Sequence, residues 1–337
     1  ADPSYEFLAA ADHCLVVGPG SGKDGGRICA QGSFDELKID LEFGFAEQSE
    51  VAEHFIEFEN LTQRHLKIDK LHLPLESIVA VCGVSGSGKS TLFTDELWPR
   101  LKEMQKTHPH LTRGGVHSLL QRSLGTSARS TLATLSGCWQ ELRELFANTV
   151  VAKRRGFKSS DFVANPSRGG CSSCKGLAVD SFGEICQECD GLALRQELLQ
   201  LRYRGASLRE WLSLPLNGLS HLLPVKGKLR TCVDLLIKLG LGSRRLSERG
   251  RVFSFGERGR IALAKRLNLI RPGSSKLFLL DEACLGLPDS EAADFLAVLR
   301  DYCKQGHSFW LIEHHHLVLR NADYLIDVTD IVEMVSI

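Results

Sequence analysis

The sequence predicts an α/β protein with a mostly parallel core sheet, and three observations support this fold class. Short apolar runs typical of buried parallel strands recur along the chain. A glycine-rich loop that suits phosphate binding follows one of these runs, at residues 83–91. An Asp-Glu pair and a histidine follow two later runs. Because ligands of parallel sheets bind where the strands end, these residues are expected to form one nucleotide site.

Composition narrows the protein class. A chain of 337 residues is long for one core, so two or three lobes are expected. Lys plus Arg and Asp plus Glu both number 41, so any nucleic-acid surface has to be local. We find no secretory signal and no apolar run of about 18 residues. We therefore expect a cytoplasmic protein without a membrane partner, whose 11 cysteines are thiols or metal ligands rather than disulfides.

Residues 1–50 are interpreted as the tail of a preceding nucleotide-binding domain and a connector. The segment 20–24 imitates a phosphate loop, but Val17 stands where the first glycine is needed and Asp24 replaces the hydroxyl residue. The strand-like run 11–17 resembles 322–328 near the far end of the chain. This match suggests that the chain begins where one nucleotide-binding domain ends and then contains a second.

Residues 51–130 are expected to form the first part of the nucleotide-binding core. Alternating apolar residues between 55 and 75 predict a small antiparallel sheet, and 78–82 predicts a buried strand. Helical spacing over 92–104 is interrupted by Pro99. A glutamine after a strand, Gln121, can reach a metal-bound water or a terminal phosphate. The expected nucleotide-binding residues of the loop are Gly83, Ser85, Gly86, Gly88, Lys89, Ser90 and Thr91, with Ser90 also a magnesium ligand.

Residues 131–250 are expected to form a helical subdomain that carries a metal module at 171–189. Two CxxC pairs with a short spacer predict a tetrahedral zinc site, and glycines after each pair suit knuckle turns. The zinc ligands are Cys171, Cys174, Cys186 and Cys189. The remaining cysteines are expected to be thiols, mostly in the core: Cys14, Cys29, Cys82, Cys138, Cys232, Cys284 and Cys303. The basic run 151–170 leads into this module and is either a solvated face or a contact with a nucleic-acid phosphate backbone.

Residues 251–337 are expected to complete the core. Ser254 and Gly256 begin a helix whose start suits a phosphate group. Asp281 ends an apolar strand and is expected to hold magnesium, while Glu282 orients or deprotonates the attacking water. After the strand at 308–312, His314 can contact the terminal phosphate. The His314–His316 triplet also suits a surface metal site, and position alone does not choose among the three.

The order of these motifs is that of an ATP-binding cassette (ABC) ATPase. With CxxC pairs between the glutamine loop and the signature helix, the chain resembles the UvrA family of DNA-damage recognition ATPases in nucleotide excision repair. The segments that carry this likeness are 11–32, 121–130, 141–147, 170–176, 312–314 and 322–327. Family members carry two cassettes in one chain, so the resemblance implies a second cassette with a tail of the first.

The resemblance implies an ABC-type fold with a helical signature subdomain and the cofactors ATP, Mg²⁺ and Zn²⁺. It makes Ser254 and Gly256 the signature pair that closes on ATP held by a facing cassette. The facing cassette is a first cassette of the same longer chain or a second copy of this one. DNA is expected at 151–170 and at the zinc module, with other excision-repair subunits as further partners.

The chain departs from the family pattern at the signature, where Phe255 replaces a glycine, and in the zinc module, where the spacer is short. Two functions therefore remain open. One is an ATP-hydrolysing cassette with weak activity in isolation. The other is a degenerate, non-hydrolysing module that binds ATP and zinc and serves as a scaffold for protein or DNA contacts.

Overall fold

The computed structural model describes residues 53–328 except 64–65, 84–85, 113, 120–126 and 128, together with strands β1 and β2. The strands are β1 (Cys14–Val17), β2 (Ile28–Gly32), β3 (Phe55–Gln63), β4 (Leu66–Pro74), β5 (Ile78–Cys82), β6 (Val116–Leu119), β7 (Arg202–Tyr203), β8 (Ala206–Ser207), β9 (Leu277–Asp281), β10 (Ser308–Ile312) and β11 (Tyr324–Asp327). The helices are α2 (Lys89–Thr91), α3 (Trp98–Met104), α4 (Pro109–Thr112), α5 (Leu132–Ser136), α6 (Cys138–Ala147), α7 (Val150–Arg154), α8 (Gln196–Leu199), α9 (Leu208–Ser213), α10 (Lys228–Leu236), α11 (Phe255–Leu267), α12 (Asp289–Cys303) and α13 (His316–Asn321). Short π-helical segments span Leu92–Leu97 and Ile237–Leu241, and 3₁₀ turns span Ser159–Asp161, Leu216–Leu219 and Gly250–Val252.

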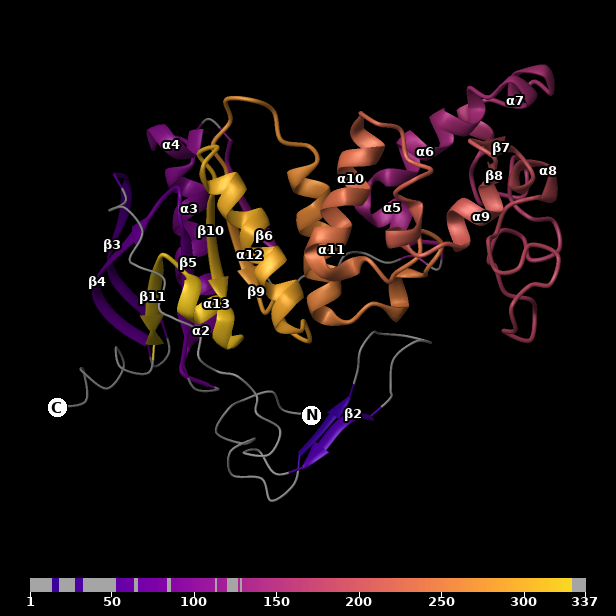
Figure 1. The fold of residues 1–337 in the computed structure, drawn as a ribbon. Helices are drawn as coiled ribbons and strands as arrows, with labels where there is room; N and C mark the ends of the chain where they lie inside the picture. Colours follow the sequence, from indigo (N-terminus) through magenta and orange to yellow (C-terminus); the bar gives the residue numbers. More distant parts are fainter. Residues whose placement is uncertain are drawn as a thin grey trace.

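A five-stranded sheet of order β11-β5-β10-β9-β6 lies between the β3–β4 hairpin and the helical region, and every pairing in it is parallel (Figure 1). Strands β5, β9 and β10 are apolar and almost wholly buried, as parallel strands covered on both faces must be. The α/β fold with a mostly parallel sheet predicted from the sequence is confirmed.

The side chains of this sheet alternate between two hydrophobic cores, because successive residues of a strand point to opposite faces. Val79, Leu279 and Trp310 pack into a core shared with the β3–β4 hairpin and with α3. Phe278 and Phe309 pack on the other face into a core shared with the helical region. Their rings are stacked, with centroids 5.2 Å apart. The sheet therefore connects the core on the side of the β3–β4 hairpin to the core of the helical region.

The predicted antiparallel unit is the hairpin of β3 and β4, which covers one face of the sheet. The helix that follows the phosphate loop runs on to Met104 through Pro99, where an interruption was expected. Proline is tolerated there because it lies in the first turn of α3, directly after the π-helical segment Leu92–Leu97.

The helices between residues 132 and 267 extend from the sheet toward the cysteine-rich loops at the opposite end (Figure 1). Among these helices, Cys138 of α6 and Cys232 of α10 are joined by a disulfide, so the expectation of thiols is wrong for this pair. Their Cα atoms lie 6.1 Å apart although 94 residues separate them in sequence. Helix packing, which spacing along the chain does not reveal, creates this proximity.

Among the described residues, no helix combines the length and apolar character that a membrane crossing requires. Most of the predicted connector at residues 1–50 lies outside the described residues. Within it the backbone of β1 pairs antiparallel with that of β2.

Candidate functional site

The phosphate loop joins β5 to the helix that starts at Lys89. Gly86 and Gly88 have φ values of +87° and +100°, which residues with a Cβ rarely adopt. Lys89 is buried, and its Nζ donates to the carbonyl of Gly83 at 2.5 Å, across the loop. The loop thus has the strand–glycine loop–helix context that phosphate binding requires. Ser85 of the predicted set lies outside the described residues.

The acids and the histidine reach the same edge because β5, β9 and β10 are parallel neighbours that end together. Ile312 of β10 pairs with Val81 on one side and with Asp281 on the other. Backbone bonds continue past the strand ends: Glu282 N donates to the Ile312 carbonyl at 2.9 Å, and Glu313 N donates to the Val81 carbonyl at 3.1 Å.

The charges of four predicted residues act on one another at this edge. Burial, together with the nearby charge of Glu282, raises the pKa of Asp281 to about 6 against the opposing effect of Lys89. Burial lowers the pKa of Lys89, while Glu282 and Asp281 oppose that shift. Burial also lowers the pKa of His314, with Lys89 acting in the same direction and Glu282 against it. Lys89, Asp281, Glu282 and His314 therefore form one cluster.

Glu282 has a backbone φ of +46°, which is uncommon for a residue with a Cβ. Such a conformation costs on the order of 1–3 kcal/mol and is found preferentially at functional sites. It occurs at the first residue after β9, where the chain leaves the sheet. The geometry agrees with a role for Glu282 in the site.

Two acids of this region were not among the predicted site residues. Glu313 is buried, accepts a hydrogen bond from Cys284 N at 2.8 Å, and has its pKa raised to about 7 by burial. Asp327, at the end of the edge strand β11, adds negative charge near Lys89 and Cys82. For Glu313 the signal was available, because it directly follows an apolar strand as Glu282 does.

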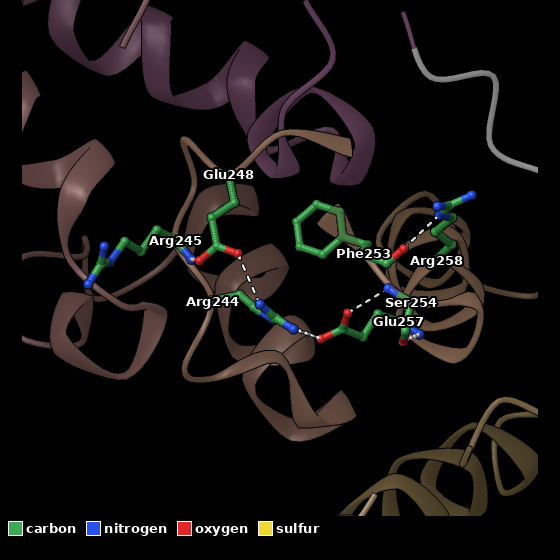
Figure 2. A network of polar contacts seen from close by, with 7 residues as sticks. All are labelled: Arg244, Arg245, Glu248, Phe253, Ser254, Glu257 and Arg258. Atoms are coloured by element: carbon green, nitrogen blue, oxygen red, sulfur yellow. Dashed lines mark hydrogen bonds and ion pairs between the residues drawn. The ribbon is translucent and has the colours of Figure 1, made fainter. Parts of the chain in front are cut away.

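The predicted signature residues begin α11, and Figure 2 shows the polar network around them. Ser254 caps the helix as expected: its Oγ accepts from Glu257 N at 3.3 Å, and Ser254 N donates to the Glu257 carboxylate at 2.8 Å. Arg244 holds that buried carboxylate through Nε at 2.7 Å and Nη2 at 2.6 Å. Phe255, in the first turn, is 41% exposed.

The four predicted zinc ligands converge in one buried cluster. Their sulfur atoms all lie within 4.8 Å of one another, with Cys171–Cys186 at 3.9 Å and Cys174–Cys189 at 3.7 Å. Sulfur atoms each about 2.3 Å from a tetrahedral zinc lie about 3.8 Å apart, so the cluster fits the ion. The expected knuckle turns are present, since Gly176 and Gly191 both have φ of +74°. Backbone N–H groups of Ala178 and Ala193 donate to Cys174 and Cys189.

The basic run is exposed and precedes this cluster. Its exposed cations are Lys153, Arg154, Arg155, Lys158 and Arg168. The hairpin between the two knuckles also presents apolar side chains, with Phe182 90% and Ile185 70% exposed.

Gln121 lies outside the described residues, so its predicted role stays a prediction.

Comparisons with known proteins agree with this geometry. No family model matches the chain. It is 30% identical to UvrABC system protein A of Clostridium acetobutylicum over 96% of its own length and 38% of that protein's. It is equally identical to the Methanothermobacter thermautotrophicus protein of the same name, over 96% of the chain and 37% of that protein. It thus spans less than two fifths of the length of these relatives.

A solved structure, UvrA2 from Deinococcus radiodurans, superposes on 97% of the chain with a TM-score of 0.82 and 26% identity, and the match covers 43% of that structure. The chain has an ABC-type ATPase fold, with a five-stranded parallel sheet and an antiparallel hairpin. The four-cysteine module is inserted into this fold and is consistent with a zinc module. By homology over 96% of its length at about 30% identity, the chain belongs to the UvrA family of ABC ATPases.

Proposed function

We propose that this chain is an ATP-hydrolysing cassette of a UvrA-like DNA-damage recognition protein that acts in nucleotide excision repair. The observation that carries the proposal is the cluster of Lys89, Asp281, Glu282 and His314 at one edge of the sheet. This set supplies a phosphate-binding cation, a metal-side acid, a base and a polar contact for the terminal phosphate. The homology described above supports the same assignment.

The loop from Gly83 to Thr91 would hold the phosphates of ATP, and Ser90 with Asp281 would hold Mg²⁺, which neutralises charge on the phosphates. Lys89 would exchange its bond to the Gly83 carbonyl for a phosphate oxygen. Glu282 would orient the attacking water and accept its proton, and Gln121 and His314 would contact that water or the terminal phosphate. The zinc site would have a folding role, because a short cysteine-rich segment has little core of its own.

We further propose that two cassettes pair face to face, so that ATP closes the pair and hydrolysis reopens it. The partner is a first cassette of a longer chain or a second copy. Ser254 and Gly256, at the start of α11, would contact ATP held by the partner. The expected setting is cytoplasmic, and activity in isolation should be weak.

DNA contact is proposed through the exposed cations of residues 151–170 and through the zinc module. The cations suit the phosphate backbone, and the exposed Phe182 suits contact with unstacked bases. Other excision-repair subunits are further candidate partners.

The test is ATP turnover by the zinc-loaded chain with a competent partner cassette, compared with Glu282→Gln and Lys89→Ala. Loss of the base should lower turnover by about a hundredfold or more while ATP binding persists. Loss of Lys89 should weaken binding itself. Turnover by the unmodified chain that does not exceed the Glu282→Gln background would refute hydrolysis.

Phe255 supports a second candidate function, a non-hydrolysing ATP- and zinc-binding scaffold. Its exposed ring lies in the first turn of α11, where a partner's phosphate would have to approach. Separate titrations with ATP and with damaged duplex DNA distinguish the two functions. Tight ATP binding without turnover in the assembled pair would favour the scaffold. Turnover restored by Phe255→Gly would show that the Phe255 ring blocks the site.

A further inference from the structure

Two histidines and an aspartate, none of them assigned a role in the nucleotide site, lie close together beside that site. Asp289 is the first residue of α12, while His315 precedes α13 and His316 begins it. One nitrogen of each histidine and one oxygen of Asp289 all lie within 4.8 Å of one another. We propose that these three side chains bind a divalent transition-metal ion of the zinc and nickel type.

The distances fit ligands that share an ion. His316 Nε2 lies 3.4 Å from Asp289 Oδ2, and His315 Nε2 lies 3.7 Å from Asp289 Oδ1. Hydrogen bonds between such atoms are usually about 2.7–3.2 Å long, so both separations are too long for good ones. Two ligands bound about 2.0–2.2 Å from a tetrahedral ion lie about 3.3–3.6 Å apart. The atoms therefore stand close to the spacing of co-ligands.

The two imidazole rings are arranged to act together. They stack with centroids 5.0 Å apart and planes 18° apart, so both Nε2 atoms can face the same carboxylate. His315 Nε2 also lies 3.1 Å from the Leu287 carbonyl, which offers an additional oxygen ligand. His315 Nδ1 is buried and, within the described part of the chain, accepts or donates no hydrogen bond. Moving the proton of His315 from Nε2 to Nδ1 frees the Nε2 lone pair for an ion. The hydrogen bond from Nε2 to the Leu287 carbonyl is then lost.

The ligand chemistry distinguishes this site from the magnesium site beside the phosphate loop and from the four-cysteine cluster. Two imidazoles and a carboxylate suit zinc, nickel or cobalt, whereas magnesium and calcium prefer oxygen ligands. The four-cysteine cluster offers only thiolates. A bound ion would join the segment that follows Glu282 to the segment that follows His314, and so fix the two strand ends relative to each other.

The experiment titrates Ni²⁺ into the full chain, with zinc already in the four-cysteine module, by isothermal calorimetry. The chain should take up an Ni²⁺ ion at this site. His316→Ala and Asp289→Asn should weaken that uptake at least about tenfold, since even outer-shell changes at metal sites cost about 10–100-fold. Both side chains are partly exposed, and circular dichroism checks that the variants fold.

Two matched histidine variants serve as controls. His72→Ala removes an exposed histidine of β4 that belongs to none of the candidate metal clusters of the described residues, and it should leave uptake unchanged. His110→Ala tests the other His-Glu-His group of the described residues, formed with His54 and Glu76. Uptake that survives His316→Ala and Asp289→Asn, uptake that is lost in His110→Ala instead, or no uptake by the unmodified chain would each overturn the proposal. None of these outcomes depends on ATP turnover.

Discussion

At Gly256 the backbone of α11 passes close to the loop that follows β9 and carries Glu282. A Cβ there would lie 2.9 Å from the Leu285 carbonyl oxygen and 3.3 Å from that of Glu282. Gly256→Ala should therefore destabilise the fold by about 1–3 kcal/mol, because backbone atoms have to move. Urea unfolding provides the measurement.

Gly259, in the same helix, is the matched control. A Cβ at that position meets no atom within 4 Å. Gly259→Ala should be neutral or stabilise the protein by up to about 1 kcal/mol, because alanine is the better helix former. Equal effects of the two substitutions would contradict the close-approach explanation.

Glu313 should make stability depend on pH. Its pKa is raised to about 7 by burial, so the folded protein binds more protons than the unfolded chain between about pH 4.5 and about pH 7. The contribution of this group to stability is then fully present below about pH 4.5 and lost as pH rises through about 7. The loss amounts to up to about 3 kcal/mol.

Urea unfolding between about pH 5 and about pH 8 checks this expectation. Glu313→Gln keeps an acceptor for Cys284 N and removes the titration, so its stability should fall less with rising pH than that of the unmodified protein. Parallel pH profiles for the two proteins would show that Glu313 is not the responsible group.

At the scale of elements, the start of α11 depends on the ion pair between Arg244 and Glu257 (Figure 2). Arg244→Ala leaves the carboxylate of Glu257 buried without its cation, which should cost about 3 kcal/mol. Arg245 is the control, because it is exposed and only its backbone N contacts Glu248. Thermal unfolding of Arg244→Ala and Arg245→Ala should separate the two residues clearly. Similar losses in both variants would count against the network.

The cysteine-rich element should be ordered by its ion. The chain should contain one zinc in the four-cysteine cluster, and Cys186→Ser should lower its occupancy. Removing zinc should speed amide hydrogen exchange at residues 170–195 and leave strands β9 and β10 protected, since these lie in the central sheet. Unchanged exchange at 170–195 after complete zinc removal would contradict a structural role.

For the whole molecule, the Cys138–Cys232 disulfide closes a loop that contains the entire zinc module. A phosphine reductant should lower unfolding stability by about 2–4 kcal/mol, because a long loop is released. The double variant Cys138→Ser/Cys232→Ser should not respond to the reductant. Cys303→Ser, which changes a free cysteine, should respond like the unmodified protein. A response by the double variant would show that other groups cause the effect.

Much of the fold and of the candidate site could be predicted because the relevant signals are local. Apolar runs identify β5, β9 and β10, because these strands are covered on both faces of the sheet and both of their faces have to be apolar. Ser254 with Glu257 is a capping pattern, and CxxC spacing fixes a metal site over a few residues. Asp281 ends β9, and Glu282 and His314 lie one and two residues beyond the ends of β9 and β10, so their convergence follows from parallel pairing. Lys89 joins them through the phosphate loop that follows β5.

The sequence by itself thus determined the strands, the glycine-rich loop and the four-cysteine cluster, because each depends on residues close together along the chain. Only the tertiary structure decided which distant residues meet. Packing of α6 against α10 brings Cys138 to Cys232, and burial between strand ends sets the pKa of Glu313. The approach of α12 to α13 likewise brings Asp289 to His315 and His316. These contacts arise from the arrangement of elements in space, which spacing along the chain does not encode.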